Sequence, residues 1–217
     1  MWTYFQRARD PIDSFTHFIG ILLAGAGTLL VVTTGLIAGT PRTYAAAGLV
    51  FCISMLALYT ASSVYHYYNG RADRLRRLRK FDHSMIYVLI AGTYTPIYFR
   101  YQPLPHALVF MGVLWGIAIA GILVKMCWIT APNWLSAAVY ILMGWALVFD
   151  FSIFAHMPAG MTALLATGGV SYTVGGVMYA LKKPDLWPNF GHHELFHIFV
   201  LVGTFFHFLA IYFYVIL

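Results

Sequence analysis

The sequence predicts an all-α membrane protein, built as a bundle of seven transmembrane helices. Of its 217 residues, 61% are hydrophobic and only 9% are charged, whereas soluble domains carry about 25% charged residues. Apolar stretches close to the length that a helix needs to cross a bilayer recur along the whole chain. Within lipid these stretches must be helical, because an unpaired backbone has no water to bond.

The seven spans are expected at 14–39, 45–68, 81–99, 105–128, 134–154, 160–181 and 194–217. The breaks between them carry turn and helix-breaking residues: Gly39-Thr40-Pro41, Asn69-Gly70, Pro103 with Pro105, Pro132-Asn133, Pro158 with Gly160, and Pro184 through Gly191. All of the connections are short, so residues 1–217 are expected to form one domain. Residues 1–13 read as a polar and aromatic lead-in. No cleavable signal peptide is expected, since the first apolar run is long enough to span.

The basic residues predict the orientation of the bundle. All of the 13 lysines and arginines except Arg42 and Arg100 fall on the side of the membrane that holds the N-terminus. Positive residues are enriched in cytoplasmic connections. The N-terminus is therefore expected in the cytoplasm and, after seven spans, the C-terminus outside.

Many of these basic residues lie in one run, Arg71 to Lys80 (RADRLRRLRK), between the second and third spans. Its simplest role is to fix the topology. A second interpretation is docking onto anionic lipids of the inner leaflet, where each basic residue contributes about 1 kcal/mol. Nucleic acid is not expected as a partner, because no soluble fold is available to present the charges.

Three histidines at the ends of apolar runs, His66, His193 and His197, are candidate metal ligands. His193 and His197 are four residues apart and therefore share a helix face, and Ser62 and His66 repeat that spacing. The predicted topology brings these residues to one depth near the inner leaflet, together with Asp82 at the start of the third span. Three imidazoles with an open fourth position are typical of a catalytic Zn²⁺ site.

The chemistry of such a site gives each neighbour an expected role. A zinc ion activates water and polarises a substrate carbonyl. Asp82 would hold that water or act as general base, and Ser62 would hydrogen-bond a ligand or stabilise an oxyanion. His17, near the start of the first span, would have a supporting role. Taken singly, a histidine at a helix end is more often interfacial, and an aspartate there is more often a cap. Their convergence at one depth favours the metal, because ionisable groups within spans are costly and tend to be functional.

Three short motifs occur in order, each at the boundary of a span: Ser62-Ser-Val-Tyr-His66, Phe81-Asp82-His83 and His193-Glu-Leu-Phe-His197. Together they resemble the hemolysin III family, the bacterial branch of the progestin and adipoQ receptors, which include the adiponectin receptors. The resemblance implies that His66, His193 and His197 bind zinc, that Asp82 contacts the metal through water, and that Ser62 is the serine of the first motif. It also implies a multi-pass protein of the bacterial cell membrane.

The resemblance implies a function in lipid chemistry, since the animal receptors are associated with ceramide hydrolysis and the wider superfamily includes alkaline ceramidases. The leading expectation is a zinc-dependent hydrolase of a lipid amide or ester, ceramide-like, at the cytoplasmic leaflet. Its membrane lipid would enter laterally between helices. The first alternative is a receptor-like or regulatory membrane protein with structural zinc. The second is a cytolysin, as the family name implies, although a compact bundle offers no amphipathic pore-lining series.

Overall fold

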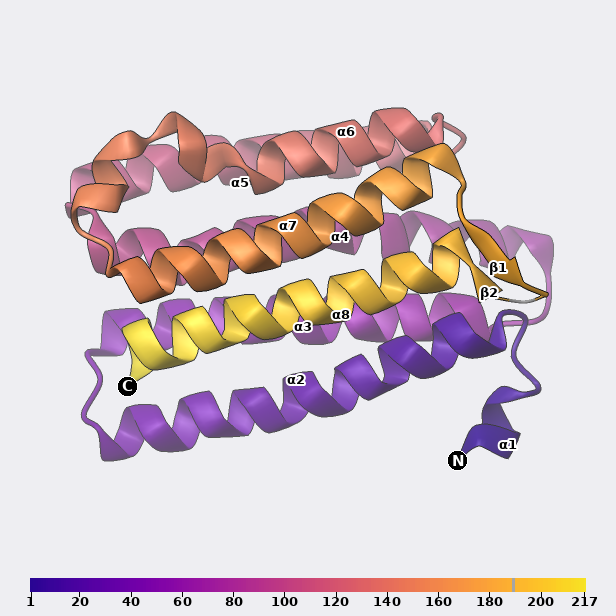
Figure 1. The fold of residues 1–217 in the computed structure, drawn as a ribbon, viewed down its shortest axis with the longest axis horizontal. Helices are drawn as coiled ribbons and strands as arrows, with labels where there is room; N and C mark the ends of the chain where they lie inside the picture. The colour runs from indigo at the N-terminus through magenta and orange to yellow at the C-terminus, as the bar shows by residue number, and fades with distance from the viewer. Residues whose placement is uncertain (189) are drawn as a thin grey trace.

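The computed structural model describes residues 1–188 and 190–217, which form a bundle of long helices lying side by side (Figure 1). The long helices are α2 (Pro11–Ile37), α3 (Arg42–Tyr67), α4 (Ala72–Tyr101), α5 (Leu104–Cys127), α7 (Ala159–Leu181) and α8 (His192–Ile211). The shorter helical elements are α1 (Trp2–Phe5), α6 (Asn133–Gly144), the 3₁₀ turns η1 (Ala146–Phe149) and η2 (Phe151–Ala155), and the π-helical turn η3 (Tyr212–Ile216). A hairpin of β1 (Asp185–Trp187) and β2 (Phe190–Gly191) joins α7 to α8.

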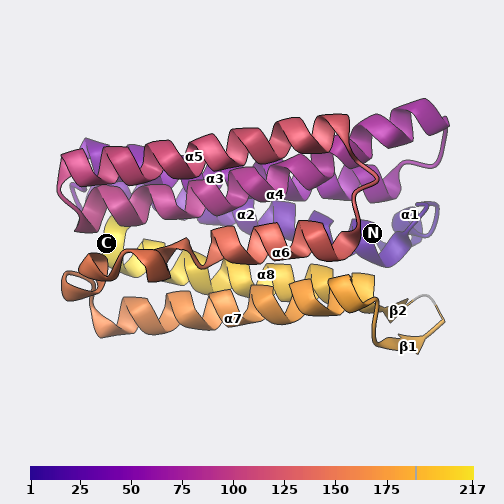
Figure 2. The ribbon, with the colours of Figure 1, turned by 90° about the horizontal axis from the view of Figure 1, so that it is seen from above.

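The predicted fold class is confirmed. Among the described residues, α2, α3, α5, α7 and α8 with its continuation η3 are long and apolar enough to cross a membrane. α4 and the segment from α6 to η2 complete the seven. In Figure 1, α6, α7 and α8 lie in front of α3, α4 and α5, and Figure 2 shows the same two groups from above.

The helix of the third span, α4, begins well before the expected residue 81. α4 starts at Ala72 and has 30 residues, which corresponds to about 45 Å of helix. The hydrocarbon core of a bilayer is about 30 Å thick, so the charged first turns extend beyond it. Arg, Leu and Lys are good helix formers, so the helix continues through this segment. The segment is too charged to be apolar, and a search for apolar runs therefore does not detect it.

The fifth span differs from the expected continuous helix over 134–154. Its α-helical part ends at Gly144, and two 3₁₀ turns follow. Tyr94 of α4 lies at the change: its hydroxyl donates to the carbonyl of Gly144 at 2.6 Å and accepts from the amide of Leu147 at 3.2 Å. An apolar run gives the length of a span, but it does not separate α-helix from 3₁₀-helix.

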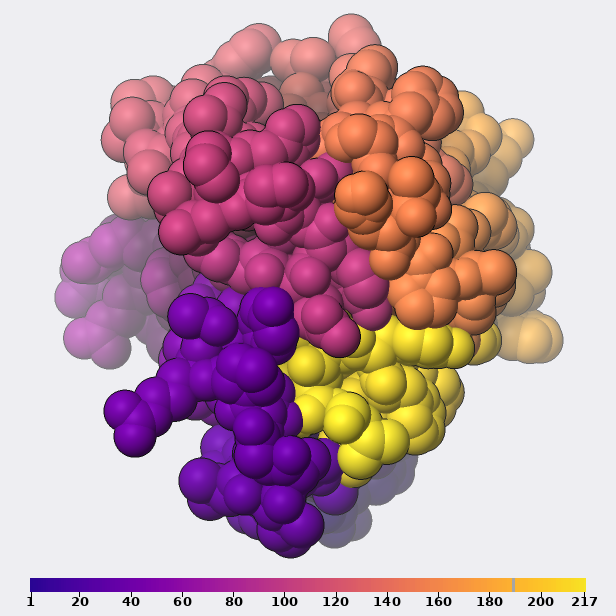
Figure 3. All heavy atoms as spheres, turned by 90° about the vertical axis from the view of Figure 1, so that its left-hand side faces the viewer, coloured from indigo at the N-terminus to yellow at the C-terminus, as the bar shows by residue number. Residues whose placement is uncertain are grey.

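The two termini lie at opposite ends of the bundle (Figure 1), as seven crossings require. Which end faces the cytoplasm stays a prediction. At the C-terminal end, Figure 3 shows the last residues of the chain seated among the other elements. There the hydroxyl of Tyr101 donates to the carbonyl of Tyr214 at 2.8 Å, and Thr40 donates to the carbonyl of Ile216. These bonds hold the C-terminal turn in place at that end.

Gly20 of α2 leaves room for the ring of Tyr59 on α3. A Cβ at residue 20 would lie 2.5 Å from that ring, which is buried and packs edge-on against His17 at 5.1 Å between centroids. We expect Gly20→Ala to lower the free energy of unfolding by about 1–3 kcal/mol, as overpacking does. At Gly25 on the same helix, no atom of the described residues lies within 4 Å of such a Cβ, so Gly25→Ala is the control. Equal thermal unfolding midpoints for the two variants would contradict this packing.

Candidate metal centre

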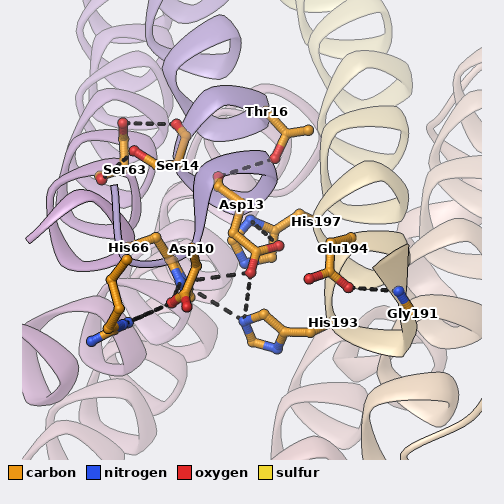
Figure 4. A network of polar contacts seen from close by, with 11 residues as sticks. Asp10, Asp13, Ser14, Thr16, Ser63, His66, Gly191, His193, Glu194 and His197 are labelled. Carbon is orange, nitrogen blue, oxygen red and sulfur yellow. Dashed lines mark hydrogen bonds and ion pairs between the residues drawn. The ribbon is translucent and has the colours of Figure 1, made fainter. Parts of the chain in front are cut away.

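Four potential metal ligands from three helices meet at the N-terminal end of the bundle (Figure 4). His66 lies in the last turn of α3, His193 and His197 in the first turns of α8, and Asp13 in the first turn of α2. One ligand atom from each lies within 4.8 Å of all the others. The structure thus brings together the three predicted histidines and adds an aspartate.

The separations within this group suit one shared ion. Nε2 of His66 lies 3.5 Å from Nε2 of His193. The carboxylate of Asp13 lies 3.9 Å from Nε2 of His193 and 3.9 Å from Nδ1 of His197. Its 3.7 Å contact with His66 is to Nδ1, the ring nitrogen that does not face His193. Two ligands bound to one tetrahedral zinc at about 2.0–2.1 Å are themselves roughly 3.4 Å apart. Only His193 has appreciable exposure, at 31% of its side chain.

Two atoms of the group are buried without hydrogen bonds. Oδ1 of Asp13 and Nδ1 of His197 have no partner among the described residues. Leaving such a group unsatisfied costs about 1–3 kcal/mol. Imidazole and carboxylate are both established zinc ligands, so the residues present fit a bound zinc ion.

A second aspartate orients His66. Nδ1 of His66 donates to Oδ2 of Asp10 at 2.8 Å, and the guanidinium of Arg9 donates to the same oxygen at 2.6 and 3.0 Å. The Arg9 guanidinium also lies over the ring of Tyr65, 4.4 Å from its centroid. A hydrogen bond at Nδ1 leaves Nε2 of His66 free to bind a metal.

Asp10 is held in its charged form. Burial by itself would raise the pKa of the Asp10 carboxyl, but the hydrogen bonds from His66 and Arg9 outweigh burial and hold that pKa well below its usual range. The backbone amide of Asp10 also donates to the carbonyl of His66 at 3.1 Å. This carboxylate is therefore a permanent partner of the imidazole.

Hydrogen bonds between elements fix the helix ends that carry the ligands. The carboxylate of Glu194 accepts from the amide of Gly191 at 2.7 Å, which caps the first turn of α8. Ser14 and Ser63 each donate to the other's carbonyl at 2.9 Å. This reciprocal pair ties α2 to α3 next to Asp13.

The predicted residues Ser62 and Asp82 are buried beside the histidines. Both line an internal cavity that also reaches His193 and His197. Asp82 does not belong to the group of four potential ligands. The fourth potential ligand of this group is Asp13, and the water-holding role of Asp82 stays a prediction.

His17 lies deeper in the same cavity. Its ring stacks on that of His197, with centroids 3.8 Å apart and planes 17° from parallel. Both of its nitrogens are buried and have no hydrogen-bond partner in the described part of the chain. His17 thus packs directly against a potential ligand, where a supporting residue was expected.

Beyond the histidines the cavity is mainly apolar and runs along the bundle. On α8 its lining extends from His193 to His207, roughly 20 Å at 1.5 Å per residue. Side chains such as Leu58, Ile86 and Val200 form its walls. A mainly apolar lining with a few polar groups is typical of small-molecule sites.

Asp10 and Asp13 were not among the predicted site residues, because residues 1–13 were interpreted as a lead-in to the first span. One signal for Asp13 was present in the sequence. It precedes His17 by four residues, so the two share a face of α2. For Asp10 no comparable spacing exists, since its contact with His66 depends on how α2 packs against α3.

Replacing Asp10 by Asn should weaken metal binding by roughly 10–100-fold, the usual effect of removing a hydrogen-bond partner from a metal-bound histidine. The side-chain amide of Asn lacks the negative charge with which the Asp10 carboxylate holds the ring of His66. Competition with a chromophoric chelator measures the affinity. Asp73→Asn is the control, because Asp73 is an exposed residue paired with Arg71 and Arg77. Unchanged affinity in Asp10→Asn would contradict the orienting role.

The chain is similar in sequence to a known protein family and to individual bacterial proteins. Residues 5–208 match the family model described as Haemolysin-III related. The chain is 33% identical over 213 residues to the Hemolysin-3 homolog of Bacillus subtilis (strain 168), covering 97% of this chain and 96% of the relative. It is 29% identical over 206 residues to Hemolysin-3 of Bacillus cereus, covering 94% and 90%.

More distant similarity extends to eukaryotic proteins. The adiponectin receptor protein of Drosophila melanogaster is 28% identical over 181 residues, covering 73% of this chain and 40% of the relative. Heptahelical transmembrane protein 4 of Arabidopsis thaliana is 28% identical over 184 residues, covering 75% and 46%. The resemblance inferred from the three motifs is confirmed. The chain belongs to the haemolysin-III related family and is a multi-pass bacterial membrane protein.

Proposed function

We propose that the protein is a zinc-dependent hydrolase of a lipid amide or ester, with ceramide-like lipids as the leading substrate class. The observation that supports this most strongly is the junction of a buried His/Asp cluster with a long apolar cavity. The cavity would take the acyl chain. Its polar end would then hold the amide or ester group beside the cluster.

In this proposal His66, His193 and His197 hold the ion. When bound, zinc polarises a carbonyl and lowers the pKa of water to about 7. Asp82 lines the cavity beside the cluster. As general base it would accept the proton of the attacking water and then return it to the leaving amine or alkoxide as the C–N or C–O bond breaks. Ser62 lies one turn before His66 on α3 and donates a hydrogen bond to the carbonyl oxygen as negative charge develops there.

A lipid panel tests the reaction. Purified protein in lipid nanodiscs is incubated with ceramides, other N-acyl lipids and glycerolipid esters, with and without chelator, and free fatty acid is quantified by mass spectrometry. We expect turnover of one amide or ester class that chelation abolishes and added Zn²⁺ restores. Zinc-loaded protein without activity on any of these lipids, or activity that persists without metal, would overturn the proposal.

A receptor-like or regulatory protein with structural zinc is the second candidate. The observation that favours it is Asp13, since structural zinc sites are closed by four protein ligands. An ion held in this way would join α2, α3 and α8. Chelation would then lower the thermal unfolding midpoint in a protein that has no lipid turnover to lose.

The basic start of α4 is proposed to bind anionic lipids of the inner leaflet. Arg74 and Arg76 are exposed there, and each basic residue near such a surface contributes about 1 kcal/mol. Arg74→Gln with Arg76→Gln should therefore reduce anionic lipid retained on the purified protein by roughly tenfold or more, measured by native mass spectrometry. Arg42→Gln, at the other end of the bundle, is the control. Equal retention in all three proteins would exclude this docking.

A further inference from the structure

We infer that Asp13 is a fourth metal ligand, which closes the coordination sphere of the resting protein. The inference rests on the metal site of the proposed function and not on its hydrolytic reaction. It differs from the sequence-based expectation of three histidines with an open fourth position. Asp82, the carboxylate expected beside the metal, lies outside the group of potential ligands.

The first argument is geometric. Asp13 uses both carboxylate oxygens toward the histidines of α8: Oδ2 faces Nε2 of His193, and Oδ1 faces Nδ1 of His197. Both separations are 3.9 Å, close to the 3.5 Å between Nε2 of His66 and Nε2 of His193. They are too long for hydrogen bonds. They match the spacing of ligand atoms around one ion.

The second argument is the charge balance. The side chain of Asp13 is 3% exposed, and among the described residues no lysine or arginine lies within ion-pair distance of it. A buried carboxylate without a countercharge is strongly destabilising. Asp10 has Arg9 as its cation, whereas Asp13 has only the imidazoles. A divalent cation bound by three neutral imidazoles supplies the missing positive charge.

A simpler role for Asp13 would be to stabilise the start of α2, since acidic residues in a first turn favour the helix dipole. That role is best served at the surface and needs no contact with another helix. Asp13 instead points inward (Figure 4), and its Oδ1 has no hydrogen bond within the described residues. The side chain is therefore placed for the cluster rather than for its own helix.

A closed sphere has a consequence for the proposed reaction. A substrate carbonyl or a water molecule can reach the ion where a protein ligand gives way or where the coordination expands from four to five. Carboxylate is a harder ligand than imidazole and suits zinc less well, so Asp13 is the ligand to be exchanged. The Asp13 side chain would then leave the ion on substrate binding, while the three histidines keep the ion in place.

Cobalt substitution tests the inference on the full chain. The zinc is replaced by Co²⁺, whose visible absorption reports coordination number, and azide is titrated as a small competing ligand. For the wild type we expect a four-coordinate spectrum that azide does not change. Asp13→Ala should still bind one Co²⁺ per chain, with weaker affinity, and its spectrum should shift with azide. Asp73→Ala, at an exposed aspartate outside the cluster, is the control and should give the wild-type spectrum with and without azide.

A wild-type spectrum that responds to azide as strongly as Asp13→Ala would overturn the inference, and so would Asp13→Ala with unchanged affinity and spectrum. If Asp13→Ala does not fold, the azide titration of the wild type decides alone. The outcome is separate from that of the lipid panel, because the spectrum requires no turnover. A hydrolase whose wild-type cobalt site binds azide would retain the proposed function and lose this inference.

Discussion

His193→Ala is expected to remove both the bound metal and the lipid turnover. His193 is the most exposed of the four potential ligands, and without it two histidines and one carboxylate remain. Loss of a hydrogen-bond partner of a metal ligand already costs 10–100-fold in affinity, so loss of a ligand should cost more than about 100-fold. Elemental analysis gives the metal content, and release of fatty acid gives the turnover.

The adjacent residue provides the control. His192 lies on the same turn of α8, but its Nδ1 contacts the carboxylate of Asp185 at 3.2 Å and it is not part of the metal cluster. His192→Ala should keep both the metal and the activity. If His193→Ala retained one equivalent of metal, the assignment of His193 as a ligand would be wrong.

Asp82→Asn is expected to lower turnover by about 10²–10⁴-fold, the usual contribution of a general base, with the metal content unchanged. Asn has nearly the same shape but cannot take up a proton from water. Turnover should fall without loss of metal because Asp82 lines the cavity but does not belong to the group of potential ligands.

Ser84→Ala is a suitable control for Asp82→Asn. Ser84 is a buried polar residue on the same helix, it bonds to the carbonyl of Lys80 at 2.7 Å, and it does not line the cavity. Its replacement should leave turnover within about twofold, as expected for a residue without a role in the transition state. Loss of metal from Asp82→Asn would mean that Asp82 is itself a ligand.

The fold class was predictable because composition and apolar length reflect the demands of the bilayer directly. Details that do not change hydropathy were not predictable in this way. The charged start of α4 is helical because of backbone propensity, and the change to 3₁₀ turns after Gly144 accompanies the hydrogen bonds of Tyr94. Neither property alters the apolar pattern from which the spans were identified.

The candidate site was predictable in part, for a related reason. Spacing by four residues places His193 with His197, and counting of basic residues brings His66 to the same end of the bundle. Asp10 and Asp13 come from a segment whose path depends on packing, including the bonds between Ser14 and Ser63. Sequence spacing within one helix cannot show which residue of another helix will face it.

The structure also connects the site to the rest of the bundle. The potential ligands come from α2, α3 and α8, so a bound ion stabilises the contacts among all three helices. Metal that binds only the folded state adds to its stability through mass action. Both candidate functions therefore share this structural effect, and lipid turnover is what distinguishes them.

X-ray absorption at the zinc edge of the full-length protein tests the metal centre most directly. We expect a first shell of four nitrogen and oxygen ligands at about 2.0–2.1 Å, with the multiple-scattering pattern of three imidazoles. In His66→Ala no such signal should remain. A folded wild-type protein that retains no zinc, or a first shell containing sulfur at about 2.3 Å, would contradict the metal centre described here.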